Sequence, residues 1–443
     1  MLETCPTTRT LVTYMVRGTL IGSNQTAFFR HVYIDPCFII WKGLIKRSKR
    51  STSRRVSFSF RAPFHQKPTT MASAKQKQKQ SKGDAASGEF ETYFSQLWGA
   101  RWKSLSSALS SPTSHCAMLN AFVNDSESCA TDILGKEARP VPWSRFVAPL
   151  KILEWSSATI GGIYPPPIRD IHSGLMPWYW LDPASLIPPL ALLRMQLRGE
   201  PASGRVLDMC AAPGGKSLVL AQLLFLLNRS AGASSLISNE IDAKRRSRLL
   251  TVLRQYIPQS LLSHDIRVLG KDGTTFAKRS NDSIDEIFDM VLIDAPCSSD
   301  RHVAQQAVGR GGVVRSSDWT VQRCKSLAKD QQKLVAAGIK ALSVGGCLVY
   351  STCSITDIQN DAVIEKIMEK AGSAVSAVSH GFSEELDACW IALGAERTKY
   401  GWIILPDTTG WGPIYWCNLR KNEHTDMKRT KVNKSASEIL HTV

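Results

Sequence analysis

Short apolar runs of two different periods alternate along most of the chain. From about residue 183, runs of strand length such as "RVLDMC" and "FDMVLIDAP" are followed by stretches of helical spacing such as "AKRRSRLLTVLRQY". The predicted strands are 205–210, 235–240, 266–273, 288–296 and 345–354, and the predicted helices are 216–227, 243–256, 329–343 and 360–371. Strands that alternate with helices predict an α/β fold with a doubly wound, parallel, Rossmann-like sheet. Ligands of such sheets bind at the carboxyl ends of the strands.

The part of the chain before this pattern has a different character. In "FETYFSQLWGARWKSLSSAL", aromatic residues and leucines recur at helical spacing, which predicts an amphipathic helix from about Phe90. The stretch from about 110 to 180 is irregular and contains "YPPPIRD". We therefore expect a small, partly helical N-terminal module over 86–182, the α/β domain over 183–421, and a disordered tail over 422–443.

A strong positive charge changes this picture of an ordinary globular protein. The 443 residues carry a formal charge of +17, with 55 Lys and Arg against 38 Asp and Glu. Such a charge favours a polyanionic partner, with nucleic acid ahead of a membrane surface. No apolar stretch reaches the length of a membrane span, and Arg17 interrupts the best N-terminal candidate.

The first 85 residues are basic and are predicted to be disordered. Residues 1–70 hold twelve Lys or Arg but only two acids, and are rich in Ser and Thr, which is typical of an organellar transit segment. A second interpretation is that translation starts at Met71. "KQKQKQSKGD" at 75–84 is a low-complexity linker.

Cysteine usage argues against a metal site and a disulfide framework. The eleven cysteines are odd in number and form no CxxC pair. Free thiols in a reducing compartment are the simplest interpretation.

A loop of small residues joins the first predicted strand to the first helix. "DMCAAPGGKS" at 208–217 places Ala211, Ala212, Gly214 and Gly215 where a ligand can approach the backbone closely. The N-terminus of the following helix favours an anionic or carboxylate group. The spacing matches neither the P-loop nor the GxGxxG pattern.

Three acids end successive predicted strands at the same sheet edge. They are Glu240, Asp272 and Asp294. Singly, each is more often a helix cap or turn residue. Together with the small-residue loop they predict a nucleoside-type ligand, with Glu240 at the ribose hydroxyls and Asp272 near an adenine amino group.

Two cysteines end neighbouring predicted strands. "DAPCSSDRH" and "YSTCS" bring Cys297 and Cys353 to one cleft beside Asp294. A lone buried cysteine is usually a small core residue, and that interpretation stays open for each. A nucleophilic cysteine needs its thiolate form, which nearby cations favour, and Lys216 and Arg301 are candidates to supply the charge.

These motifs together resemble one family. The chain from about 180 to 421 resembles the Sun-domain (Fmu-type) RNA cytosine-C5 methyltransferases in "DMCAAPGGKS", "NEIDAKR", "KDG", "DAPCSSDR" and "GGCLVYSTCS". "FETYFSQLWGARW", "WLDPASLIPPLALL" and "LPDTTGWGPIYWCNLRK" resemble its mitochondrial members. The resemblance implies that 183–421 is a class I S-adenosylmethionine-dependent methyltransferase domain.

The resemblance also implies roles for single residues. S-adenosyl-L-methionine would be the cofactor, with no metal. The cofactor-binding residues would be Cys210, Ala211, Ala212, Pro213, Gly214, Gly215, Lys216, Glu240, Arg245, Asp272, Gly273 and Asp294. Cys353 would attack cytosine C6, Asp294 would hydrogen-bond the N3 edge of the base, and Cys297 would release the product. The base would have to be unstacked, so single-stranded or flipped RNA is expected.

The expected substrate is mitochondrial small-subunit rRNA, because "SSDRH" and "IRVLGKDG" are more like the rRNA-directed member. A mitochondrial tRNA is the alternative, and a non-catalytic RNA-binding ribosome assembly factor is a second. The expected location is the mitochondrial matrix. The small N-terminal module suggests an RNA-binding partner protein. Residues 303–318, "VAQQAVGRGGVVRSSD", fit either a mobile RNA-contacting loop or an insertion.

Overall fold

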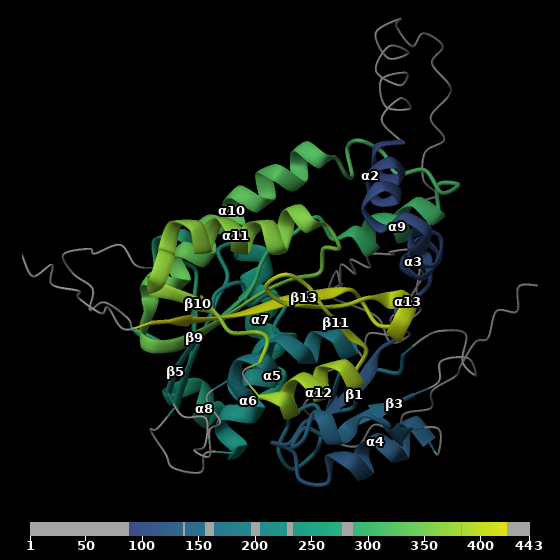
Figure 1. The fold of residues 1–443 in the computed structure, drawn as a ribbon. Coiled ribbons are helices and arrows are strands. Elements are labelled where there is room, and N and C mark those ends of the chain that lie inside the picture. Colours follow the sequence, from purple (N-terminus) through teal and green to yellow (C-terminus); the bar gives the residue numbers. More distant parts are fainter. Residues whose placement is uncertain are drawn as a thin grey trace, which may run out of the picture. The chain divides into compact units, whose positions relative to one another are not determined.

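A mixed β-sheet forms the centre of the fold in the computed structural model, which describes residues 88–135, 138–155, 164–195, 204–227, 234–276, 287–381 and 383–422. The strand order is β11-β12-β13-β9-β8-β5-β6-β7, and β10 pairs with β13 (Figure 1). The strands are β5 (Gly204–Asp208), β6 (Ser234–Asn239), β7 (Ile266–Leu269), β8 (Phe288–Asp294), β9 (Leu342–Thr352), β10 (Val375–Ala377), β11 (Ala395–Arg397), β12 (Trp402–Ile404) and β13 (Ile414–Lys421). The transit segment and the linker predicted for 1–85 lie outside the described residues, as does all but the first residue of the tail predicted for 422–443.

The parallel half of this sheet confirms the sequence-based prediction. Strands β7, β6, β5, β8 and β9 pair in parallel, and the order reverses between β5 and β8. A crevice for ligands lies at such a reversal. The antiparallel extension through β13, β12 and β11 was not predicted. These strands follow one another without long helices, so no βαβ pattern marks them in the sequence.

Helices cover both faces of the sheet because residues of a strand point alternately to the two sides. On β8, Met290 and Leu292 pack into one core, and Val291 and Ile293 pack into the other. The first core includes residues of α5 (Ile187–Arg194), α6 (Gly215–Leu227), α7 (Ala243–Tyr256) and α12 (Glu384–Ala392). The second includes residues of α9 (Asp300–Val308), α10 (Val321–Ala341) and α11 (Asp361–Ala371) (Figure 1). The short helices α8 (Gln259–His264) and α13 (Pro406–Thr409) complete this domain.

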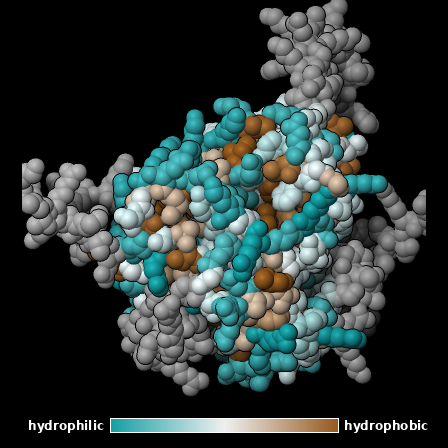
Figure 2. All heavy atoms as spheres, viewed as in Figure 1, coloured by the Kyte–Doolittle hydropathy of each residue, from teal (hydrophilic) through white to brown (hydrophobic). Residues whose placement is uncertain are grey.

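The visible surface shows few large hydrophobic areas, as expected when helices cover both hydrophobic cores. On the face seen in Figure 2, hydrophobic residues form separated patches among hydrophilic ones. Within the described residues, no helix combines the length and the apolar composition needed to cross a membrane.

The N-terminal module is more regular than the sequence indicates. Its helices are α2 (Gly88–Trp98), α3 (Trp102–Ser110) and α4 (Ser126–Leu134), and its strands are β1 (Cys116–Leu119), β2 (Arg139–Pro140), β3 (Ile152–Glu154) and β4 (Trp178–Leu181). The strands form an antiparallel sheet in the order β2-β3-β1-β4, which was not predicted, although most described residues from 110 to 180 lie outside helices and strands. All four residues of β1 are buried, which removes the alternation that identifies a strand from sequence.

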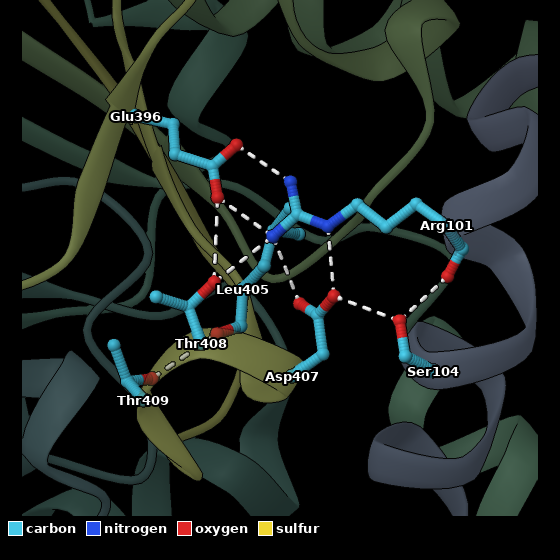
Figure 3. Close-up of polar contacts among 7 residues, drawn as sticks. All are labelled: Arg101, Ser104, Glu396, Leu405, Asp407, Thr408 and Thr409. Atoms are coloured by element: carbon cyan, nitrogen blue, oxygen red, sulfur yellow. Dashed lines mark hydrogen bonds and ion pairs between the residues drawn. The ribbon is translucent and has the colours of Figure 1, made fainter.

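One arginine connects the N-terminal helices to one end of the central sheet. The Arg101 guanidinium donates to both carboxylate oxygens of Glu396, at 2.7 and 2.6 Å, and of Asp407, at 2.7 and 3.0 Å (Figure 3). Glu396 lies on β11 and Asp407 on α13. Paired contacts of a planar guanidinium with carboxylates fix orientation as well as distance. Arg101 therefore holds α3 against elements almost 300 residues further along the chain.

Residues 303–318 are part helix and part ordered turn. They begin inside α9 and continue as turns, where Arg310 and Asp318 form an ion pair of 2.7 Å. Val314 is buried, as is Trp319 just beyond the segment, and Trp319 packs against Phe90. The segment is therefore anchored to the N-terminal helices at its end.

Candidate active site

The loop between β5 and α6 requires glycine at its end. Gly214 has φ of +120°, and a Cβ atom there would lie 3.0 Å from the Val252 side chain. A Cβ at Gly215 would lie 3.2 Å from the Tyr179 ring. Larger residues would be strained at the first position and crowded at the second. Glycine at these two positions therefore lets the loop pack closely against Val252 and Tyr179.

A buried carboxylate lies at the start of this loop. Asp208, the last residue of β5, is 0% exposed and accepts a 2.7 Å hydrogen bond from the Ser217 hydroxyl. Its Oδ1 has no hydrogen-bond partner among the described residues. Burial raises the pKa of Asp208 to about 7, although the Ser217 hydroxyl opposes the shift. Asp208 was not among the predicted site residues, although it is the first residue of "DMCAAPGGKS" at 208–217.

Glu240 and Arg245 are connected to the same loop. Glu240, immediately after β6, is 3% exposed and accepts a 2.9 Å hydrogen bond from the Asp242 backbone N–H. Arg245 forms a 3.3 Å ion pair with Glu240 and donates to the Ala212 carbonyl at 2.9 Å. Arg245 thus links the acid that follows the second strand to the loop after the first.

Asp272 acts as a local cap. Its carboxylate accepts from the backbone N–H and the hydroxyl of Thr274, both at 2.9 Å, at the start of a short 3-10 helix, Gly273–Thr275. Gly273 is buried, and a Cβ there would lie 2.7 Å from the Leu334 side chain of α10. The strand β7 ends at Leu269, so Asp272 stands beyond the strand and not at its last residue.

A cavity of about 200 Å³ opens above the loop. Residues 210–213, Asp208, Gly215, Lys216 and Asp294 contribute to its wall, together with His115, Tyr179 and Trp180 of the N-terminal module and its flanks. The N-terminal module and the α/β domain therefore both contribute to the wall of this cavity.

Lys216 and Asp294 form an ion pair in this wall. Lys216 Nζ lies 2.7 Å from Asp294 Oδ2, and the Ser351 hydroxyl donates to Asp294 Oδ1 at 3.2 Å. Burial by itself would lower the pKa of Lys216, but the charge and hydrogen bond of Asp294 outweigh it and the pKa is raised. Lys216 therefore stays charged, and Asp294 is held from both of its oxygens.

The two predicted cysteines lie together. Strands β8 and β9 are parallel neighbours with Asp294 opposite Ser351, so the turns that follow them meet. Cys297 Sγ and Cys353 Sγ are 3.0 Å apart, and the Ser299 hydroxyl oxygen is 3.7 Å from Cys353 Sγ. The structure therefore brings the two thiols together, as expected from the sequence, but neither of them lines the cavity at Asp294.

The contact between the two thiols shifts their pKa values in opposite directions. A hydrogen bond from Cys297 lowers the pKa of Cys353, against the opposing effects of burial and the Asp294 charge. The same hydrogen bond, with burial, raises the pKa of Cys297 well above its ordinary value of 9.0. The pair holds one proton between its two sulfurs, and these directions favour Cys353 as the thiolate.

Arg301 does not supply charge to the thiols, contrary to expectation. It is 7% exposed and donates to the carbonyl oxygens of Trp411, Ser111 and Pro112, at 2.7, 3.3 and 3.2 Å. Strand order places the start of α9 near the site, but it does not determine the direction of a long side chain on that helix.

Comparison with known proteins now identifies the family. Residues 195–420 match the family model of 16S rRNA methyltransferases RsmB/F. The chain belongs to this family. Mouse 5-cytosine rRNA methyltransferase NSUN4 is 29% identical over 359 residues, which cover 75% of the chain and 87% of that protein. A mouse mitochondrial tRNA (cytosine(34)-C(5))-methyltransferase is 34% identical over 265 residues, covering 59% of the chain and 68% of that protein.

Solved structures support the fold of the RsmB/F family member. A methyltransferase homologue from Pyrococcus horikoshii aligns with a TM-score of 0.52 at 22% identity, over 74% of the chain and 93% of that structure. NSun6 from the same organism, solved with SFG, aligns with a TM-score of 0.52 at 16% identity, over 76% of the chain and 98% of that structure. Both show a shared fold.

As a member of this family, the chain is an S-adenosylmethionine-dependent RNA cytosine-C5 methyltransferase. The residues of the cavity fit the methionine part of this cofactor. A carboxylate oxygen without a partner among the described residues, on Asp208, suits an ammonium group, and the small residues Ala211 and Ala212 line the cavity beside it. When bound, the cofactor supplies an electrophilic methyl group on a sulfonium.

Asp208 is expected to make the unfolding free energy fall as pH rises from about 4 to about 7. Its pKa is near 7 in the fold and 3.8 ordinarily, so the folded state binds the extra proton in this window. Full conversion of that shift amounts to about 4 kcal/mol, an upper bound. Asp208→Asn should remove most of this slope in denaturant titrations of the cofactor-free protein. An unchanged slope would contradict the assignment.

Proposed function

We propose that the chain forms 5-methylcytosine in RNA by covalent cysteine catalysis, with Cys353 as the nucleophile. The observation that carries this proposal is the thiol pair, 3.0 Å apart, in which Cys297 favours the ionised form of Cys353. Cytosine C5 is a poor nucleophile. Addition of the Cys353 sulfur at C6 moves electron density to C5, which can then accept a methyl group.

Asp294 and Lys216 are proposed to orient the base. A proton taken up from solvent at N3 would neutralise the negative charge that develops on the ring, and the Asp294 carboxylate would accept a hydrogen bond from that N3–H. Its ion pair with Lys216 and its hydrogen bond from Ser351 keep the carboxylate in place. A preorganised group of this kind needs little rearrangement during reaction.

Cys297 is proposed to act in product release. While Cys353 carries negative charge, the pKa of Cys297 is raised by the hydrogen bond to it, by burial and by the charge of Cys353. Once Cys353 is bonded to carbon, that charge is gone and Cys297 can lose its proton to solvent. The Cys297 thiolate can then take the C5 proton as the bond from Cys353 to C6 breaks.

The cofactor is proposed to lie along the strand ends. Residues 210–216 would surround its methionine part, and Glu240, positioned by Arg245, would bind the ribose hydroxyls. Asp272 and Gly273 would border the adenine. Because Asp272 already caps the short helix that follows it, we expect its contribution to be the weaker one.

Mitochondrial small-subunit rRNA is the proposed substrate, and the matrix is the proposed location. Support comes from the similarity to the rRNA methyltransferase across 87% of that protein. The mitochondrial tRNA enzyme is also similar, at 34% identity, so a tRNA cytosine is the alternative substrate. We also propose that an RNA-binding partner protein helps the chain to bind its RNA. Full activity of the purified chain on naked RNA would argue against that partner.

Bisulfite sequencing of organellar RNA after loss of the protein tests the substrate. We expect one rRNA cytosine to lose methylation and to regain it with the wild-type chain but not with Cys353→Ala. Loss at a tRNA cytosine would support the alternative. If no mitochondrial cytosine changes, the proposed substrate class and location are wrong. Rescue by Cys353→Ala would instead favour a non-catalytic assembly factor.

A further inference from the structure

One buried carboxylate bridges the two turns that carry the cysteines. Asp300, the first residue of α9, is 0% exposed. Its Oδ1 accepts from the Ser298 hydroxyl at 2.6 Å and from Trp319 Nε1 at 2.8 Å. Its Oδ2 accepts from the Ser354 hydroxyl and the Ile355 backbone N–H, both at 2.8 Å.

The sequence positions of these partners give the contact its meaning. Ser298 directly follows Cys297, and Ser354 directly follows Cys353. One carboxylate oxygen therefore binds the turn after β8, and the other binds the turn after β9. The two hydroxyl oxygens are themselves 3.1 Å apart.

Burying a carboxylate without a counterion costs free energy, which argues that Asp300 has a specific role. Among the described residues, no lysine or arginine forms an ion pair with Asp300, and Arg301 beside it is bonded to backbone carbonyls. Burial raises the pKa of Asp300, and the hydrogen bonds from Ser298, Ile355 and Ser354 oppose that rise. A buried carboxylate without a counterion is tolerated only when donors satisfy it.

The backbone of the first turn is also constrained. Ser299, between Ser298 and Asp300, has φ of +52°, a conformation that non-glycine residues rarely adopt. Its hydroxyl oxygen lies 3.7 Å from Cys353 Sγ and 4.0 Å from Cys297 Sγ. The bonds on both sides of Ser299 offset the strain that this conformation carries.

We infer that Asp300 is a positioning residue that locks the two cysteine turns together and so keeps Cys297 within hydrogen-bonding distance of Cys353. The inference rests on the proposed covalent mechanism for its functional meaning. Its geometric content is independent of RNA, because the thiol pair can be probed without substrate.

The test measures alkylation of Cys353 by iodoacetamide against pH in the cofactor-free full chain, read by mass spectrometry of the Cys353 peptide. The titratable and charged groups that face Cys353 are Cys297, Asp294, Asp300 and, through its charge, Lys216. Asp300→Asn keeps the shape of the side chain, but its amide nitrogen cannot accept from the Trp319 or Ile355 N–H groups. If the turns separate, Cys353 loses the Cys297 hydrogen bond.

The two possible roles of Asp300 predict opposite signs. If Asp300 positions the turns, the variant should react about tenfold more slowly at neutral pH, since one pKa unit is a tenfold change in thiolate fraction. If Asp300 acted only through its negative charge, which raises the pKa of Cys353, its removal should make alkylation faster. An unchanged profile, even with a lower melting temperature, or a profile shifted to lower pH overturns the inference.

Matched variants keep the test decisive. Asp289→Asn removes a carboxylate on β8, the strand that leads to the Cys297 turn, and should leave the profile unchanged. Asp289 accepts from the Arg205 backbone N–H and the Ser343 hydroxyl, 2.8 and 3.2 Å away. If Asp300→Asn does not fold, Ser298→Ala and Ser354→Ala each cut one connection and retain the charge. Both should slow alkylation, and no effect in either contradicts the inference. A wild-type chain that fails to methylate RNA would refute the proposed function without changing this readout.

Discussion

Cys353→Ala is expected to abolish methyl transfer to RNA, with a loss on the order of 10⁴-fold or more, as when other covalent enzymes lose their nucleophile. The reason is that no other described thiol can replace it. Cys297 lies in the turn after a different strand, with its sulfur 3.0 Å from that of Cys353, and in the variant burial still raises its pKa. The measurement is transfer of labelled methyl from S-adenosylmethionine to a transcript that contains the target cytosine.

Two controls separate lost chemistry from lost structure. Cys129→Ala removes a partly exposed thiol on α4, in the N-terminal module, and should change the rate by less than about twofold. Cys353 does not line the cavity assigned to the cofactor, so the Cys353→Ala chain should bind S-adenosylmethionine with nearly unchanged affinity. Turnover above a tenth of the wild-type rate would show that Cys353 is not the nucleophile.

The elements that bear the site could be predicted because of how parallel sheets are built. Each of the strands β5 to β9 is an apolar run followed by a chemically distinctive turn, and adjacent parallel strands bring those turns to one edge. Asp294 and Ser351 lie opposite each other, so the turns that follow them bring Cys297 and Cys353 into contact. Strand order alone was sufficient for that contact.

Side-chain direction and long-range partners could not be predicted in this way. Arg301 follows the cysteine turn as expected, but its guanidinium faces the loops at Ser111 and Trp411. Asp300 gains its role only through Ser354 and Trp319, which come from different elements. A local pattern contains none of these distances, so Asp300 was indistinguishable from a helix-capping residue.

The N-terminal sheet was overlooked for a related reason. Its strands hold two to four residues, and in β1 every one is buried. Periodicity needs a longer run with two unlike faces. The module nevertheless contributes Tyr179 and Trp180 to the cavity wall. Because its strands were not predicted, this part of the wall was not predicted either.

Cys297→Ala is expected to accumulate a covalent complex between the chain and RNA. Attack by Cys353 and methyl transfer remain possible, but the group assigned to remove the C5 proton is absent. The bond between Cys353 and C6 should then persist. In denaturing gels, wild-type protein should show little shifted RNA, and the variant should shift a fraction that approaches the amount of active enzyme.

The adduct should also depend on pH in a way that the wild-type reaction does not. Cys297 lowers the pKa of Cys353 through its hydrogen bond, so its removal leaves burial and Asp294 to raise that pKa. The attacking thiolate becomes scarcer at neutral pH, and adduct formation by Cys297→Ala should quicken as the pH rises toward 9. The double variant Cys297→Ala with Cys353→Ala should form no adduct at any pH. An adduct in that double variant, or none in Cys297→Ala across the range, would mean that the two thiols do not divide attack and release between them.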